Sequence, residues 1–270
     1  MQRRVLRSVP LSTRLFSSAA LTLKRLPGGV SDIAAFLNPC DNLFYVDKAA
    51  FIPVVEKAAN VSVLLRPKRW GKSVFLKMLA SYYDAAHAAS PLVRVPVRDT
   101  PLACSFTILK FDVANVARAL SSTVTGSDMQ SLVAAALDAE VRLAVANAGD
   151  RYNIPSFDMM QPPTELLRKL GHLAQSRGAP LYIFVDEYDA VLRTIAISSG
   201  AHALSALAGC QGPLREFFGR FKYLVDADLA SRVFMTGELQ RSARAQASLS
   251  LAHARCRHFR RRSGSHDHRL

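Results

Sequence analysis

The decisive stretch of the sequence is VSVLLRPKRWGKSVFLKMLASYY, residues 61–83. Its first part, residues 61–66, is rich in apolar and β-branched side chains and ends in a turn with Pro67, which is typical of a buried strand. From Lys72 to Tyr83, apolar residues recur at helical spacing. A strand, a turn and a helix in this order predict a unit of an α/β fold with a mainly parallel sheet.

The turn RPKRWGKS, residues 66–73, matches the second half of the phosphate-binding loop pattern G-x-x-x-x-G-K-[S/T]. Gly71 lets the backbone approach a phosphate, and the helix that follows presents free N–H groups at its N-terminus. Lys72 can reach β- and γ-phosphate oxygens, and Ser73 can ligate Mg²⁺. A solvated basic turn is the alternative interpretation. The residues expected to bind nucleotide are Arg66, which replaces the first glycine, Pro67, Lys68, Arg69, Trp70, Gly71, Lys72 and Ser73.

A second motif, LYIFVDEYD at residues 181–189, is an apolar run that ends in acids. The carboxyl ends of parallel strands lie at one edge of a sheet, so this strand end and the loop are expected to converge. There Asp186 is predicted to hold Mg²⁺ with Ser73, and Glu187 to polarise the attacking water as the catalytic base. A charged turn after a core strand is the alternative, but both motifs together favour nucleotide binding.

Further elements are expected to complete a three-layer P-loop NTPase fold. Thr236 ends the short strand RVFMTG, and it is predicted to sense the γ-phosphate or the water as a catalytic residue. Asp112 ends another strand, SFTILKFDVA, and is expected at the same edge. The patterns predict strands at 105–114 and 232–237, and helices at 127–148, 164–174 and 213–225.

These motifs resemble those of the AAA-ATPase-like family of P-loop NTPases. The chain carries YVDK at 45–48, RPKRWGKS at 66–73, VDEYDAVL at 185–192 and FMTG at 234–237, in the family's order. The resemblance runs from about Asn38 to Gly237, and an Arg in place of the first glycine is the family's form. It implies an ATP-binding module that hydrolyses ATP with Mg²⁺. Members often carry a restriction-endonuclease-like nuclease domain behind the ATPase.

The segment after Gly237 departs from the family pattern. It begins ELQRSARAQ, lacks apolar periodicity and becomes rich in Arg. We expect an AAA-ATPase-like domain at 38–240 that is truncated at its C-terminus, and a basic, disordered tail at 241–270. The helical lid, a second sensor arginine and the nuclease domain are expected to be missing. A nucleotide-binding or interaction module without hydrolysis, such as a truncated ATPase or an effector-type protein, therefore stays open beside the ATPase.

The net charge of +14 is concentrated at the two ends of the chain. Residues 1–31 carry +6, residues 241–270 carry +7 and the middle, 32–240, only +1. A basic tail can bind phosphates, so a nucleic-acid binder acting through its tails is a third hypothesis. The nearly neutral middle argues against a dedicated nucleic-acid surface. A protein or nucleic-acid partner is not identified, and a homo-oligomer is possible; Arg215, Arg220 and Arg232 are arginine-finger candidates by location only.

The first 31 residues are rich in Arg and Ser and contain no acid. This composition is typical of a mitochondrial transit peptide, so we expect import into the matrix. A disordered leader without an address is the alternative, with a cytoplasmic or nuclear protein. No run of about 18 strongly apolar residues occurs, so no membrane-spanning helix is expected.

Overall fold

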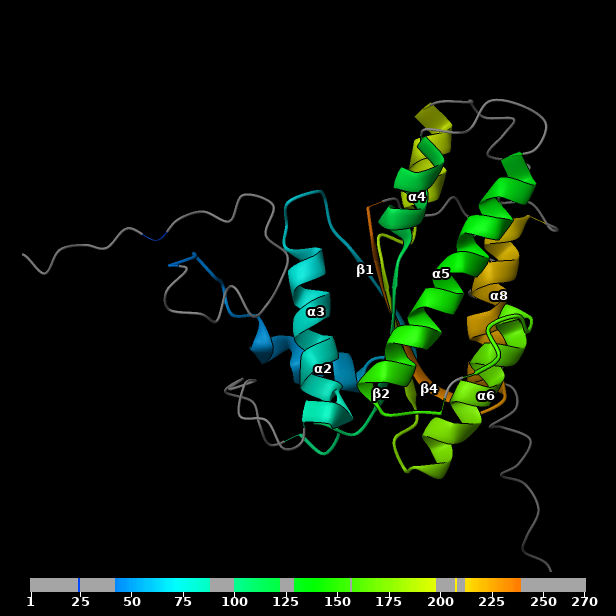
Figure 1. The fold of residues 1–270 in the computed structure, drawn as a ribbon. Coiled ribbons are helices and arrows are strands. Elements are labelled where there is room, and N and C mark those ends of the chain that lie inside the picture. The colour runs from blue at the N-terminus through cyan, green and yellow to red at the C-terminus, as the bar shows by residue number, and fades with distance from the viewer. Residues whose placement is uncertain are drawn as a thin grey trace, which may run out of the picture.

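The structure is a computed structural model that describes residues 24, 42–87, 100–121, 129–155, 157–197, 207 and 212–238 (Figure 1). The expected leader at 1–31, apart from Lys24, and the expected tail at 241–270 lie outside the described residues. Along the chain the elements are η2 Ala49–Phe51, α2 Ile52–Lys57, β1 Val61–Leu65, α3 Lys72–Tyr83, η3 Ala85–His87, β2 Thr107–Asp112, α4 Val113–Ser121, α5 Met129–Arg151, α6 Pro163–Ser176, β3 Leu181–Asp186, α8 Pro213–Asp226 and β4 Ala230–Gly237. Residues 190–197 are also helical.

The four described strands form one sheet in the order β1-β4-β3-β2, and every neighbouring pair is parallel. Val63 of β1 lies opposite Met235 of β4, which lies opposite Val185 of β3. Because all four strands run parallel, a crossover has to connect each strand to the next one along the chain. The expected α/β fold with a mainly parallel sheet is confirmed.

Helices cover both faces of the sheet and make a three-layer structure (Figure 1). Side chains alternate along β3, so Tyr182 and Phe184 pack with α2 and α3, whereas Ile183 and Val185 pack with the helices of the other face. That second layer consists of α4, α5, α6 and α8. Because β3 is buried on both faces, it reads in the sequence as a continuous apolar run. None of the helices in the described ranges combines the length and hydropathy of a membrane span.

The turn from β2 into α4 differs from the sequence expectation. The predicted strand runs to residue 114, but β2 ends at Asp112 and α4 begins at Val113. Asp112 accounts for this change, because its Oδ1 accepts the backbone N–H groups of Ala114 at 3.0 Å and Asn115 at 3.3 Å. A carboxylate that accepts these free N–H groups stabilises a helix start.

Glu140 on α5 braces this turn and predicts a pH dependence of stability. Its Oε1 accepts the backbone N–H of Asp112 at 2.9 Å. Burial raises the pKa of Glu140, the backbone hydrogen bond opposes the shift, and the charge of Asp112 adds to it. A carboxyl whose folded pKa is raised contributes stability that is present below its unfolded pKa and is lost as the pH rises through the folded pKa.

Glu140→Gln keeps an acceptor for Asp112 but does not titrate. We expect the variant to gain stability relative to wild type between about pH 4 and about pH 7, because only wild type then buries a charge. Urea unfolding of both proteins at each pH measures the difference. A difference in unfolding free energy that is the same at both pH values would contradict this role of Glu140.

Candidate functional site

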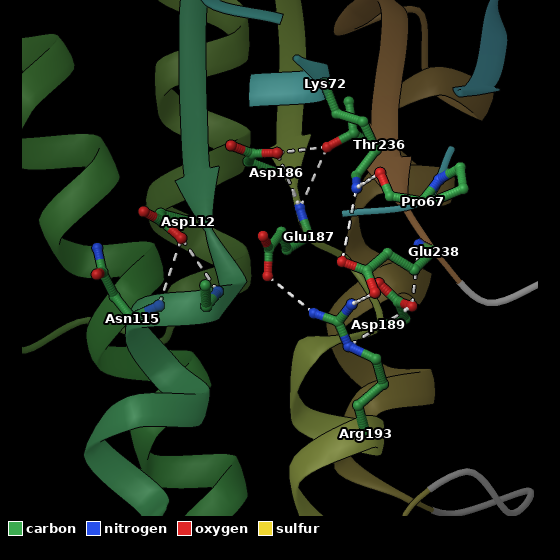
Figure 2. A network of polar contacts seen from close by, with 11 residues as sticks. Pro67, Lys72, Asp112, Asn115, Asp186, Glu187, Asp189, Arg193, Thr236 and Glu238 are labelled. Atoms are coloured by element: carbon green, nitrogen blue, oxygen red, sulfur yellow. Dashed lines mark hydrogen bonds and ion pairs between the residues drawn. The ribbon is translucent and has the colours of Figure 1, made fainter. Parts of the chain in front are cut away.

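The carboxyl edge of the sheet brings together three segments that are far apart in sequence (Figure 2). Residues 66–71 follow β1, Asp186 and Glu187 come from the end of β3, and residues 236–238 come from the end of β4. Strand β4 lies between β1 and β3, so its end separates the loop from the two acids. The sequence prediction that the two motifs converge at one edge is confirmed by this strand order.

The loop between β1 and α3 has the backbone form of an anion-binding turn. Arg69 (φ 63°) and Gly71 (φ 74°) are both left-handed, and Gly71 is the N-cap of α3. Its carbonyl accepts the N–H of Phe75 at 3.0 Å, so the helix starts at Lys72. Left-handed residues in a turn expose successive N–H groups, and a helix N-terminus favours negative charge.

Lys48 holds the loop from outside, a role that sequence reasoning did not assign. Its Nζ donates to the carbonyl of Trp70 at 3.2 Å, and a Cβ on Gly71 would lie 2.9 Å from the same Nζ. The positive φ of residue 71 favours glycine, and a Cβ there would also displace the flexible end of the Lys48 side chain. The motif YVDK includes Lys48, but the motif alone does not indicate that Lys48 contacts the loop.

Lys72 is buried, with only 6% of its surface exposed. Its Nζ donates to the carbonyl of Pro67 at 3.0 Å and lies 3.6 Å from Oε1 of Glu238. The side chain thus curls back under the loop, and its ammonium lies between the loop and the end of β4 (Figure 2). A buried ammonium has to be paired, which these two oxygens achieve.

Asp186 and Thr236 form the centre of the edge. The fully buried Thr236 donates its hydroxyl to Oδ1 of Asp186. The N–H of Glu187 donates to the hydroxyl oxygen of Thr236 at 3.3 Å and to Oδ1 of Asp186 at 3.1 Å. Glu187 has a positive φ of 48°, an uncommon conformation for a residue with a side chain. The contacts of its N–H with Asp186 and Thr236 hold the backbone in this conformation.

Arg193 is a member of the site that sequence reasoning missed. It lies in the helical segment 190–197, with its guanidinium 2.8 Å from Glu187 Oε2 and 2.6 Å from Glu238 Oε2. Burial alone would lower the pKa of Arg193, but Glu238, Asp189 and Glu187 together raise it. Arg193 therefore stays charged and binds the side chain of the predicted catalytic base (Figure 2).

Close packing fixes the end of β4 against the other two segments. The N–H of Arg66 donates to the carbonyl of Gly237 at 3.2 Å, which ties the loop to β4. A Cβ on Gly237 would lie 2.4 Å from the ring of Tyr188, so only glycine fits there. The N–H of Tyr188 in turn donates to the carbonyl of Thr236 at 2.9 Å. The segments that follow β1, β3 and β4 are thus connected through their backbones.

The residues at this edge fit a magnesium nucleotide in their chemistry. Mg²⁺ takes oxygen ligands, and proteins usually hold it by one or two side chains together with phosphate oxygens. Asp186 offers a carboxylate at the strand end, and Ser73 is a half-buried residue in the first turn of α3. Within the described ranges, no group of three or more His, Cys, Asp or Glu side chains is arranged as a metal cage.

Other candidates from the sequence have structural contacts instead. Asp112 is the register partner of Asp186, as expected, but its carboxylate caps α4. Arg220 is buried between Asp138 and Glu216 at 2.6 and 2.7 Å, and Arg232 donates to the carbonyls of residues 55 and 56. These contacts give Arg220 and Arg232 a role within the fold.

The chain matches the model of a known protein family. The family model described as AAA-ATPase_like, a predicted AAA-ATPase, matches residues 27–244. Neither the curated proteins nor the solved structures contain a significant match to the chain. The matched range includes the loop, the Asp-Glu pair and the end of β4, and it covers well over half of the 270 residues. The chain therefore belongs to the AAA-ATPase-like family.

Proposed function

We propose that this chain binds Mg·ATP at residues 66–73 and hydrolyses it. The observation that carries the proposal is the convergence of a left-handed, glycine-containing loop and its buried Lys72 with Asp186 and Glu187 at one sheet edge. Phosphoryl transfer to water needs positioned cations, a metal ligand and a residue that orients the water. This edge offers a candidate for each of these roles, and membership of the family supports nucleotide as the ligand.

Each residue has a defined task in this proposal. The N–H groups of the loop and the ammonium of Lys72 hold the phosphates, and Arg66, Lys68 and Arg69 add positive charge. Ser73 and Asp186 would hold Mg²⁺, which supplies charge neutralisation for the departing phosphate. Thr236 keeps Asp186 oriented through its hydroxyl, and Glu187 accepts a proton from the attacking water.

One observation favours the second candidate, a nucleotide-binding module without turnover. Glu187 Oε2 is paired with Arg193 at 2.8 Å, so this oxygen is engaged in an ion pair instead of being free to contact a water. In this case nucleotide binding would be retained and Glu187 would be structural. ATP turnover of the wild-type chain, with and without DNA, separates the two candidates.

Replacing Asp186 by alanine tests the metal role. Because Asp186 is predicted to contact Mg²⁺ and not the nucleotide itself, Asp186→Ala is expected to weaken binding of Mg·ATP about tenfold or more while changing Mg-free ATP binding much less. Calorimetric titration with and without Mg²⁺ measures both affinities. Asp226→Asn, an exposed acid at the end of α8, is the control. Equal losses with and without the metal would contradict the assignment.

We also propose mitochondrial import from the composition of residues 1–31. A fluorescent reporter fused to residues 1–35 is expected to co-localise with mitochondria, because the segment carries +6 and no acid. The control fusion replaces Arg3, Arg4 and Arg7 with glutamine and is expected to lose most of the mitochondrial signal. A diffuse cytosolic or nuclear signal from the unchanged fusion would contradict the proposal.

A further inference from the structure

A chain of four charged side chains crosses the candidate site (Figure 2). Lys72 lies 3.6 Å from Glu238, Glu238 lies 2.6 Å from Arg193, and Arg193 lies 2.8 Å from Glu187. Lys72, Arg193 and Glu238 expose only 5%, 17% and 16% of their side chains. The chain links the lysine that is predicted to bind phosphate with the acid that is predicted to activate water.

Glu238 is the member of this chain that has no task in the proposed reaction. It directly follows β4, and its N–H donates to Asp189 Oδ2 at 3.1 Å, which holds the residue at the strand end. This backbone contact orients its side chain toward Lys72 on one side and Arg193 on the other. A carboxylate beside the phosphate-binding lysine is negatively charged, as a phosphate is, and both groups pair with the ammonium of that lysine.

The contact between Glu238 and Lys72 is of a kind that phosphate can displace. Oε1 of Glu238 is buried, yet within the described residues it accepts no hydrogen bond, so its tie to Lys72 is an ion pair alone. Arg193 has Glu187 and Asp189 as its other carboxylate neighbours, 2.8 and 3.9 Å away. The positive charge of Arg193 is therefore balanced by these two carboxylates even without Glu238. Lys72, in contrast, has only Glu238 as a negative partner among the ion pairs of the described residues.

We propose that Glu238 is a positioning residue that competes with the nucleotide's phosphates for Lys72, and that Arg193 retains Glu238 when phosphate takes its place. This inference rests on the proposed function. Competition of this kind sets the affinity of the site for nucleotide, because binding has to break one ion pair of Lys72 before it forms another. Glu238 then lowers the affinity, in contrast to the loop residues, which raise it.

Glu238→Gln tests the inference, because it keeps the size and polarity of the side chain and removes only the charge. Trp70 is the only tryptophan of the chain, it lies in the loop and 63% of its surface is exposed, so intrinsic fluorescence reports binding of Mg·ATP. We expect Glu238→Gln to bind Mg·ATP roughly fivefold more tightly or better, because binding then no longer has to break an ion pair of Lys72. Glu165→Gln, which removes a carboxylate from an exposed pair with Arg168 on α6, is the matched control and should change nothing.

A double-mutant cycle separates local competition from a general loss of negative charge. In the Lys72→Met background, Glu238 has no ammonium to compete for, so adding Glu238→Gln is expected to change the affinity less than twofold. Glu238→Ala serves as a second variant, and circular dichroism checks that each variant is folded. An unchanged or weaker affinity of both Glu238 variants, in a wild type that binds Mg·ATP, would overturn the inference and leave the proposed function intact. A wild type that binds no Mg·ATP would overturn both.

Discussion

Lys72→Ala is expected to weaken ATP binding roughly 10- to 150-fold, which corresponds to about 1.5–3 kcal/mol for a hydrogen bond to a charged group. Lys72 is the first residue of α3, so its positive charge adds to the positive potential of the helix N-terminus. Removing it deletes the only buried cation of residues 66–73, while Glu238 stays paired with Arg193.

Matched controls separate this loss of binding from a loss of folding. Lys57→Ala removes an exposed lysine at the end of α2, before β1 and therefore at the opposite edge of the sheet. It is expected to bind ATP like wild type. Lys72→Met keeps most of the buried volume and should weaken binding as much as the alanine variant does. Equal ATP affinity of wild type and both Lys72 variants would remove the loop from the account.

Glu187→Gln is expected to bind Mg·ATP about as well as wild type and to hydrolyse it about 10²–10⁴-fold more slowly, the usual loss when a general base is removed. The amide keeps the shape of the side chain and the backbone contacts to Asp186 and Thr236, because these use the N–H of residue 187. It loses the charge that Arg193 binds and the capacity to accept the proton of the water.

Phosphate release at saturating Mg·ATP measures the rate, and the fluorescence of Trp70 measures the affinity in the same samples. The control is Glu165→Gln, which also removes a carboxylate bound to an arginine but lies on α6. Its turnover should equal that of wild type. If the Glu187 variant keeps the wild-type rate, Glu187 is not the base, and its ion pair with Arg193 is then a structural contact.

The sequence predicts the strands and helices that position the site. It does not predict features that depend on contacts of single side chains. Strand β3 is an apolar run whose burial on both faces could be inferred from its composition, and α3 begins and ends where its apolar periodicity does. Helix α4 was not expected, because the apolar residues after Asp112 also fit the end of a strand. The capping contacts of Asp112 decide between the two, and they depend on the turn in three dimensions.

The candidate site shows the same division. Two strand ends with polar residues meet at one edge by topology alone, so Asp186 and Thr236 could be placed together from the pattern. Arg193 and Glu238 could not, because each is a single charged residue whose contacts cross between the ends of β3 and β4. Glu238 lies in the segment after Gly237, whose composition departs from the family pattern, so the sequence gives no reason to assign this residue to the site.

The most direct test of the central claim is a titration of the wild-type chain with Mg·ATP, followed by the fluorescence of Trp70. The account predicts a saturable change with one nucleotide per chain, because Trp70 lies within the loop that binds the phosphates. It also predicts that inorganic pyrophosphate competes with ATP and that Lys72→Ala shifts the curve to higher ATP concentrations. A fluorescence signal and a calorimetric signal that both stay flat up to millimolar Mg·ATP, with a folded protein, would contradict the claim that residues 66–73 form a nucleotide site.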